Sequence, residues 1–376
     1  MKFPNFLSNQ SWNELNRFKK LSINERKIVF YAENKASINH YRQLIHELTE
    51  KRNLQICYVT SVKDDPMLYQ KNIKIKSFFI GEGSARIQFF ITLDAKVLIM
   101  DMPDLDNFHI KKSKIYPVHY IYIFHSIFST HTYLRNDALF NFDTIFCAGP
   151  HHIVEIKKTE ELYSLNSKNL IEYGFGRVDD LLQKKNNVDY KSKLILITPT
   201  YGKNNLLEKC GIDLIKILLD SGYEVVLRPH FRIFNESSNL IKKIENEFRK
   251  NENFSLEKGV ISNDLFEKSL CLITEWSGIS FEYAFVFEKP VFFIDLPQKI
   301  LNHDYDKLSI IPMEVENREK IGYIISINNL QKIIDIIKKN EFDILKNKIR
   351  ETRSACIFNI GSSGEKGAQF IQEIIS

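Results

Sequence analysis

The sequence predicts an α/β protein built from two Rossmann-like halves, each with an open parallel sheet. The first observation is an alternation of short apolar segments with longer segments of helical spacing, such as KIVFYAE (27–33) followed by SINHYRQLIHELTEKR (37–52). The second is length, because 376 residues exceed what one hydrophobic core ordinarily supports. We therefore expect two domains.

The first half is predicted to span residues 1–183, beginning with a helical N-terminal extension (1–24). We expect this extension to pack on its own domain, and its aromatic and basic residues leave a membrane-surface helix as the alternative. Further strands are predicted at 54–60, 76–81, 95–101, 120–126 and 144–150, and a further helix at 151–165.

The polar segment 184–192 has no periodicity and is predicted to be a linker to a second domain at 193–376. The alternation restarts there, with strands predicted at 194–200, 223–230, 271–276 and 290–295 and helices at 204–222, 235–250 and 277–288. The tail is predicted to be helical, with the last helix (363–375) crossing back to the first domain. Ligands of open parallel sheets bind beyond the carboxyl ends of strands, so we expect a ligand in a central cleft between the halves.

Composition excludes several classes of protein. A net charge of +5 is small for this length and does not indicate a nucleic-acid partner. The five cysteines lack paired spacing, and no Cys/His cluster indicates a metal. The N-terminus lacks the apolar segment of a signal peptide, and no apolar segment reaches the roughly 18 residues of a spanning helix. A cytoplasmic location is therefore expected.

Polar residues follow two strands predicted in the second half. Thr198 and Thr200 end the first of them, and Arg228 and His230 end the next. An arginine can form two hydrogen bonds to a phosphate, and a histidine can donate to one. Threonines at a strand end either pack there or contact a base or phosphate, and the residues leave both open.

The third strand end of this half is TEWSGISFEY (274–283). Glu275 is a candidate binding residue at this strand end. It precedes Ser277, Gly278 and Ser280, which should begin a helix whose first N–H groups favour an anion. A serine before a helix is usually only an N-cap, but three such strand ends should meet at one edge of the sheet. The sequence therefore predicts a nucleotide-diphosphate site there, with Glu282 either near a ribose or on a partly buried helix face.

The first half contributes YIYIFHSIFSTHTYLRND (120–137). His125 ends a predicted strand, and a histidine of near-neutral pKa can deprotonate a hydroxyl, although histidines at strand ends are more often structural. Ser126 and His131 follow as further cleft candidates. Arg177 and Asp179 lie at the predicted domain junction, either as a hinge ion pair or as cleft contacts.

In their order along residues 115–370, these motifs resemble the CDP-glycerol glycerophosphotransferase family, which are teichoic-acid-polymerase-like transferases of GT-B type. FHS resembles the family's Trp-His-Gly, GFGRVD its Gly-Tyr-Pro-Arg-x-Asp, and TPT its Ala-Pro-Thr. RPH resembles the family's Arg-x-His, and TEWSGISFEY resembles Thr-Asp-Tyr-Ser-Ser with the helix that follows it.

The resemblance implies a GT-B-like fold and a transferase of bacterial surface-polysaccharide synthesis. It implies transfer of glycerol phosphate, or a related polyol phosphate, from a CDP-activated donor to a hydroxyl of a lipid-linked or oligosaccharide acceptor. No cofactor or metal is implied, and the place of action is the cytoplasm or the cytoplasmic face of the inner membrane. The implied roles are a general base (His125), pyrophosphate binding (Arg228 and His230), phosphate binding (Ser277, Gly278 and Ser280) and ribose binding (Glu282).

Two departures from the family pattern leave the donor and acceptor open. Phe-His-Ser stands in place of Trp-His-Gly, and Glu-Trp-Ser-Gly stands in place of Asp-Tyr-Ser-Ser. The first alternative is a GT-B glycosyltransferase that uses a UDP-, GDP- or CMP-sugar, because a fold does not determine the donor. The second is a non-catalytic or epimerase-like protein that binds nucleotide sugars.

Overall fold

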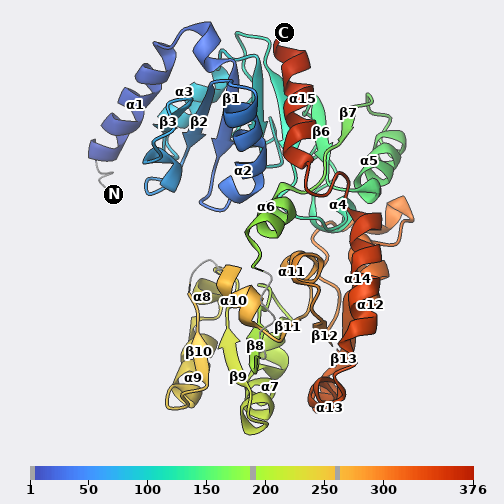
Figure 1. The fold of residues 1–376 in the computed structure, drawn as a ribbon. Helices are drawn as coiled ribbons and strands as arrows, with labels where there is room; N and C mark the ends of the chain where they lie inside the picture. Colours follow the sequence, from blue (N-terminus) through green and yellow to red (C-terminus); the bar gives the residue numbers. More distant parts are fainter. Residues whose placement is uncertain (1–4, 187–191, 259–262) are drawn as a thin grey trace. The chain divides into compact units, whose positions relative to one another are not determined.

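A computed structural model describes residues 5–186, 192–258 and 263–376 (Figure 1). The chain divides into two compact units, each built on its own parallel sheet. The first unit comprises Met1–Asp180, Leu301–Ile310 and Cys356–Ser376, and the second comprises Leu181–Ile300 and Ile311–Ala355. The prediction of two parallel α/β domains is confirmed.

The described part of the first unit holds a seven-stranded sheet in the order β3-β2-β1-β4-β5-β6-β7, with every neighbouring pair parallel. The chain enters at β1, moves outward to β3, and returns to β4 beside β1, so a topological switch point lies between β1 and β4. Residues of the central strands are buried on both faces, which explains their continuous apolar character. The strands are β1 (Ile28–Ala32), β2 (Ile56–Thr60), β3 (Ile75–Phe79), β4 (Val97–Met100), β5 (His119–Ile123), β6 (Thr144–Cys147) and β7 (Asn169–Glu172).

Helix α1 packs on its own unit, against α3 and β3. Phe18 is buried, and its ring meets the rings of Phe78 and Phe89 edge-on. Among the described residues, no helix has the length and apolar character that crossing a membrane requires. The α-helices in this part of the chain are α1 (Asn5–Lys19), α2 (Ile38–His46), α3 (Ser84–Ile91), α4 (Thr130–Tyr133), α5 (Pro150–Leu162) and α6 (Gly176–Lys184).

The last helix, α15 (Ser363–Ile375), belongs to the first unit and packs against α2, as predicted (Figure 1). Two glycines allow the close approach, because a Cβ at Gly364 or Gly367 would overlap atoms of α2 or of Tyr173. Asp179 fixes the start of α15. Its carboxylate accepts from the Gly361 N–H at 2.7 Å, from the Ser363 N–H at 3.0 Å and from the Ser363 hydroxyl.

The described part of the second unit holds a six-stranded parallel sheet in the order β10-β9-β8-β11-β12-β13. Its strands are β8 (Leu194–Ile197), β9 (Glu224–Leu227), β10 (Phe254–Leu256), β11 (Cys271–Thr274), β12 (Val291–Asp295) and β13 (Gly322–Ser326). Its helices are α7 (Leu206–Asp220), α8 (Ile233–Glu236), α9 (Ser238–Phe248), α10 (Asn263–Lys268), α11 (Ile279–Phe287), α12 (Met313–Ile321), α13 (Lys332–Lys339) and α14 (Phe342–Cys356).

The two units differ from the predicted ranges 1–183 and 193–376, because two late segments pack in the first unit. In segment 301–310, the Leu301 N–H donates to the Thr132 carbonyl oxygen at 2.8 Å. In segment 356–376, the Phe358 N–H donates to the Ala148 carbonyl oxygen at 2.9 Å. Such partners lie far apart in sequence, so no local pattern predicts them. Within the predicted linker, residues 187–191 lie outside the described residues.

Candidate active site

His125 lies in the loop after β5, and its side chain is exposed. Its Nδ1 lies 3.1 Å from the backbone carbonyl oxygen of Asp101. Because a carbonyl oxygen can only accept, this contact places the proton of a neutral ring on Nδ1 and leaves Nε2 as the basic nitrogen. A histidine held in one tautomer with Nε2 available is suited to general-base chemistry.

Asp101 follows β4, the neighbour of β5, and its side chain is buried. One carboxylate oxygen lies 3.0 Å from the Ser37 hydroxyl and 2.7 Å from the Tyr41 hydroxyl. Burial raises the pKa of Asp101, whereas a positive charge on His125 would stabilise its carboxylate. Asp101 therefore supports the histidine through its backbone contact and its charge, a role that the sequence alone did not indicate.

His40 lies near both His125 and Arg177. The His40 ring centroid is 6.3 Å from that of His125, and its Nδ1 is buried without a hydrogen-bond partner in the described structure. Burial lowers the pKa of His40 well below its usual value, and the charges of His125 and Arg177 lower it further. The predicted residues His125 and Arg177 thus both lie near the neutral His40, which the sequence analysis did not single out.

The other candidates predicted in the first half form internal contacts of this unit. Ser126 accepts from the Phe128 N–H at 3.2 Å within a local turn. His131 is buried, with Nε2 at 3.3 Å from the Ile310 carbonyl oxygen and Nδ1 at 3.6 Å from a Glu155 carboxylate oxygen. Asp179 is the capping residue of α15 described above. A polar pattern does not show which partner satisfies a polar group, so these internal contacts could not be predicted from the sequence.

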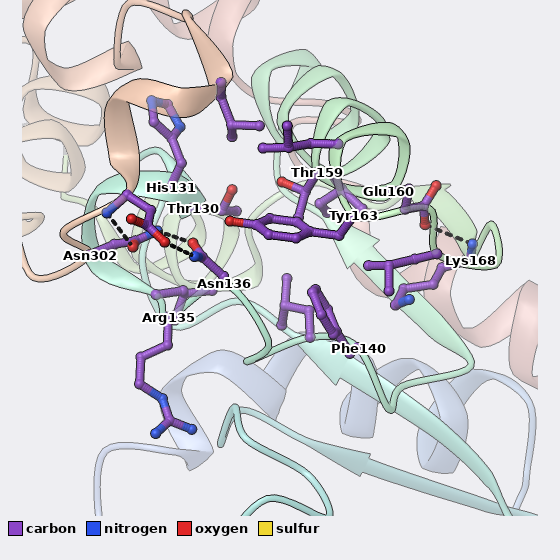
Figure 2. A pocket seen from close by; sticks show the side chains of 17 residues that line it. Thr130, His131, Arg135, Asn136, Phe140, Thr159, Glu160, Tyr163, Lys168 and Asn302 are labelled. Carbon is purple, nitrogen blue, oxygen red and sulfur yellow. Dashed lines mark hydrogen bonds between the residues drawn. The ribbon is translucent and has the colours of Figure 1, made fainter.

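A small pocket lies in the first unit beside α4 and α5, and segment 301–310 closes one side of it (Figure 2). The Asn136 amide donates to the Asp304 carboxylate at 2.7 Å, and the Asn302 amide donates to the Asn136 side-chain oxygen at 2.7 Å. The Tyr163 ring spans the pocket, and its buried hydroxyl has no hydrogen-bond partner among the described residues. The residues that line this pocket do not include His125.

In the second unit, a buried carboxylate ties the ends of β8 and β11 together. One oxygen of Glu275 accepts from the N–H and the hydroxyl of Thr200, both at 2.9 Å, and from the Leu206 N–H at 3.3 Å. Burial raises the pKa of Glu275 to about 6, although these hydrogen bonds oppose the rise. Thr198 is buried beside it, and its carbonyl oxygen accepts from the Thr274 hydroxyl at 2.7 Å. Glu275 and Thr200 therefore shape this edge of the sheet.

A cluster of basic groups surrounds Tyr201, in the loop after β8. The His230 ring lies 4.5 Å from the Tyr201 ring, the Arg232 guanidinium 4.6 Å and the Lys299 ammonium 3.1 Å. Burial lowers the pKa of His230 to about 4, and the charges of Lys299, Arg228 and Arg232 lower it further. The positive charges of these three residues give the cluster a positive local potential, which favours an anion. Sequence analysis predicted Arg228 and His230 but missed Arg232 and Lys299.

The predicted phosphate-binding residues at the start of α11 differ in burial. Ser280 is buried, and its hydroxyl donates to the Ser277 carbonyl oxygen at 2.6 Å, so this hydroxyl serves the helix start rather than a phosphate. Ser277 and Gly278 are half-buried directly before the helix. Glu282 lies half-buried in the first turn of the helix. Ser277, Gly278 and Glu282 remain candidates for contact with a ligand.

Arg318, on α12, was also missed by the sequence analysis. Its guanidinium lies 3.8 Å from the Trp276 ring and 4.9 Å from the Phe293 ring. Burial lowers the pKa of Arg318 to about 10, and the charge of Asp295 opposes this change. The Trp276 indole N–H donates to the Leu296 carbonyl oxygen at 2.9 Å, so Trp276 is held both through its ring face and through its N–H.

Residues 13–305 match the sequence model of the family described as CDP-Glycerol:Poly(glycerophosphate) glycerophosphotransferase. The chain belongs to this family. The resemblance predicted from the order of motifs is therefore confirmed. A teichoic acid poly(glycerol phosphate) polymerase of Staphylococcus epidermidis is 26% identical over 151 residues, which cover 34% of this chain and 20% of that protein. The match thus spans about a fifth of the curated relative.

Solved structures confirm the GT-B-like fold of this family member. The wall teichoic acid polymerase TagF superposes with a TM-score of 0.59 at 16% identity, covering 99% of this chain and 95% of that chain. A protein from Listeria monocytogenes described as a UDP-N-acetylglucosamine 2-epimerase superposes with a TM-score of 0.61 at 12% identity, covering 93% and 96%. At such identities these likenesses show the fold alone.

Proposed function

We propose that this protein transfers glycerol phosphate, or a related polyol phosphate, from a CDP-activated donor to a hydroxyl of a glycan. Family membership supports the class of reaction, and a structure of TagF soaked with CDPG supports a CDP-linked donor. The single observation that carries the proposal is the exposed His125 ring, whose Nδ1 contact with Asp101 leaves Nε2 as the base.

In the proposed reaction, Nε2 of His125 removes the proton of the acceptor hydroxyl. The resulting oxygen attacks the phosphorus atom that carries the glycerol. The bond from this phosphorus to the bridging oxygen breaks, and CMP leaves with the electron pair. Negative charge therefore develops on CMP, where preorganised cations lower the barrier.

We assign donor binding to the cluster around Tyr201 in the second unit. Arg228, Arg232 and Lys299 supply positive charge, and the neutral His230 supplies a hydrogen-bond donor. The N-terminus of α11, with Ser277 and Gly278, adds N–H groups of the kind that bind phosphate. We further propose that these groups supply the charge stabilisation without a metal or cofactor, so that transfer persists in the presence of a chelator.

The acceptor in this proposal is a lipid-linked or oligosaccharide glycan of a bacterial surface polysaccharide. The reaction then takes place in the cytoplasm, with contact at the cytoplasmic face of the inner membrane where the acceptor is lipid-linked.

The proposal is tested by incubating the protein with CDP-glycerol and glycan acceptors and following the release of CMP, with and without a chelator. Binding of CMP, CDP, CDP-glycerol, UDP and common nucleotide sugars is measured in parallel through the melting temperature, because a ligand that binds the folded state raises it. Selective stabilisation by cytidine nucleotides and acceptor-dependent release of CMP support the proposal. A preference for a uridine or guanosine sugar would indicate a glycosyltransferase, and binding without turnover would indicate a nucleotide-sugar binder.

A further inference from the structure

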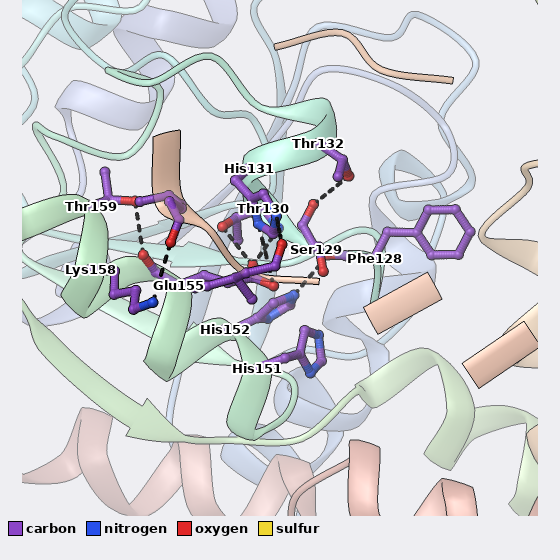
Figure 3. A network of polar contacts seen from close by, with 12 residues as sticks. Phe128, Ser129, Thr130, His131, Thr132, His151, His152, Glu155, Lys158 and Thr159 are labelled. Atoms are coloured by element: carbon purple, nitrogen blue, oxygen red, sulfur yellow. Dashed lines mark hydrogen bonds and ion pairs between the residues drawn. The ribbon is translucent and has the colours of Figure 1, made fainter. Parts of the chain in front are cut away.

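The loop that carries His125 is held by side chains from the start of α5 (Figure 3). Loops at strand ends are generally more mobile than the strands themselves. Here, however, Ile127, Phe128 and Thr130 are all hydrogen-bonded to side chains of α5. The loop is therefore anchored within five residues of His125.

His152 contacts the chain on both sides of His125. Its ring centroid lies 3.8 Å from that of Phe124, with an angle of 33° between the ring planes. Its Nε2 lies 3.0 Å from the Phe128 carbonyl oxygen, and its Nδ1 lies 3.2 Å from the Ala148 backbone nitrogen. His152 thus brackets His125, from the residue before it to the third residue after it.

The partners of His152 define its tautomer. The Ala148 N–H can only donate and the Phe128 carbonyl can only accept, so the ring is neutral with its proton on Nε2. Burial lowers the pKa of His152 well below its usual value, and the charge of His151 lowers it further. His152 therefore keeps both hydrogen bonds at neutral pH.

His151 and Glu155 extend the anchor to the next residues of the loop. His151 Nε2 lies 2.8 Å from the Ile127 carbonyl oxygen. One carboxylate oxygen of Glu155 accepts from the Thr130 N–H at 2.6 Å and from the Thr130 hydroxyl at 2.8 Å. Glu155 is fully buried, so its hydrogen bonds are shielded from competing water.

The start of α5 is itself fixed in place. The backbone of Gly149 lies against Cys356 so closely that a Cβ would overlap the Cys356 carbonyl oxygen. The C-terminal segment makes a second contact here, because the Phe358 N–H donates to the Ala148 carbonyl oxygen at 2.9 Å. The anchor of the His125 loop is therefore a helix start that the C-terminal segment of the chain holds.

We propose that His152, with His151 and Glu155, is a positioning residue for His125. This inference rests on the proposed function, in which His125 is the base. The Nδ1 contact with Asp101 decides which ring nitrogen of His125 is basic, and that contact depends on where the loop backbone lies. A displacement of about 1 Å can slow a reaction by about a hundredfold, so loss of the anchor slows proton transfer without touching the donor.

The test uses two variants of the full chain at one position. His152→Phe keeps an aromatic ring against Phe124 but removes both ring nitrogens. His152→Gln keeps an N–H donor for the Phe128 carbonyl. We expect His152→Phe to lower kcat at least tenfold while the KM for CDP-glycerol changes less than twofold, and we expect His152→Gln to retain most of kcat. An unchanged kcat in folded His152→Phe overturns the proposal, and so does a parallel change in kcat and donor KM.

A second measurement separates this proposal from the proposed function. The imidazole ¹⁵N resonances of His125, assigned by their absence in His125→Gln, report its tautomer without any turnover. If the wild-type protein transfers nothing, the proposed function fails, but a changed His125 tautomer in His152→Phe still supports positioning. An unchanged tautomer overturns it. Should His152→Phe fail to fold, His151→Leu removes the neighbouring donor to Ile127 and is judged by the same two outcomes.

Discussion

The Nδ1 of His125 lies 3.1 Å from the backbone carbonyl oxygen of Asp101. Asp101 follows β4 and His125 follows the neighbouring strand β5, so the parallel pairing of these strands brings the two residues together. Its chemical consequence is the assignment of the basic nitrogen, because only a protonated Nδ1 can donate to a carbonyl.

We predict that His125→Ala lowers the transfer rate by about 10²–10⁴-fold, the usual contribution of a general base. Affinity for cytidine nucleotides should stay within twofold, since the groups assigned to the donor lie in the second unit. The rate of CMP release and calorimetric binding check these two statements. His46→Ala, which removes an exposed histidine at the end of α2, is the control. A His125→Ala protein with the wild-type rate would exclude His125 as the base.

We predict that affinity for a nucleoside diphosphate falls as pH rises through 8. Burial lowers the pKa of Lys299 to about 8, with the charge of Glu275 opposing the change, so Lys299 loses its positive charge above that pH. The loss of one charged contact corresponds to about a tenfold change in affinity. Lys299→Arg stays charged and should show a flat profile between pH 7 and 9.5, whereas the exposed-site control Lys250→Arg should follow the wild type. Titration calorimetry with CDP decides, and identical profiles in wild type and Lys299→Arg contradict the prediction.

We predict that Glu275 makes the second unit less stable as pH rises from 4.5 to 7. The pKa of Glu275 is about 6 in the folded protein against an ordinary 4.5, so the folded state binds the proton more tightly than the unfolded state. This stabilisation of the folded state is lost as pH rises through 6. The difference corresponds to about 2 kcal/mol.

Glu275→Gln keeps an acceptor oxygen for Thr200 but cannot ionise. The melting temperature of Glu275→Gln minus that of the wild type should therefore be larger at pH 7 than at pH 4.5. Glu252→Gln, at an exposed position of the same unit, should track the wild type at both pH values. A difference between Glu275→Gln and wild type that stays constant with pH argues against the raised pKa.

We predict that Gly149→Ala lowers the free energy of unfolding by about 1–3 kcal/mol, because the added Cβ would overlap the backbone of Cys356. Its φ of −158° is extended, so the cost is steric. Gly83→Ala is the matched control, since Gly83 also precedes a helix but a Cβ there meets no atom within 4 Å. Its effect should stay within about 0.5 kcal/mol. Thermal and denaturant unfolding measure both, and equal effects at the two glycines would contradict the steric explanation.

Much of the fold could be predicted from short segments of the sequence. Strands buried on both faces of a parallel sheet are continuous apolar segments, as in IVFYA at β1 and VFFID at β12. The alternation of such segments with helices predicts parallel sheets. The return of α15 to the first unit was also predicted, although the contacts that hold it there join residues far apart in the sequence.

The candidate site could be predicted only in part. Arg228 and His230 follow a strand of the second sheet and His125 follows a strand of the first, so topology places each residue at the carboxyl edge of its own sheet. Ser280 and Asp179 look equally polar in sequence, yet their hydrogen-bonding groups serve helix starts inside the protein. Sequence gives the number of donors and acceptors of a residue, but not which of them are already used.

The sequence by itself thus determined the two parallel sheets, the family and the strand ends that carry polar residues, because each depends on periodicity or on motifs within a few residues. Only the tertiary structure brought Lys299 and Arg232 to Tyr201, Asp101 to His125, and His152 to both Phe124 and Phe128. These contacts join residues on different elements. They depend on how the elements pack. Packing therefore decides which nitrogen of His125 is basic, which cations gather around Tyr201 and how the loop that carries His125 is anchored.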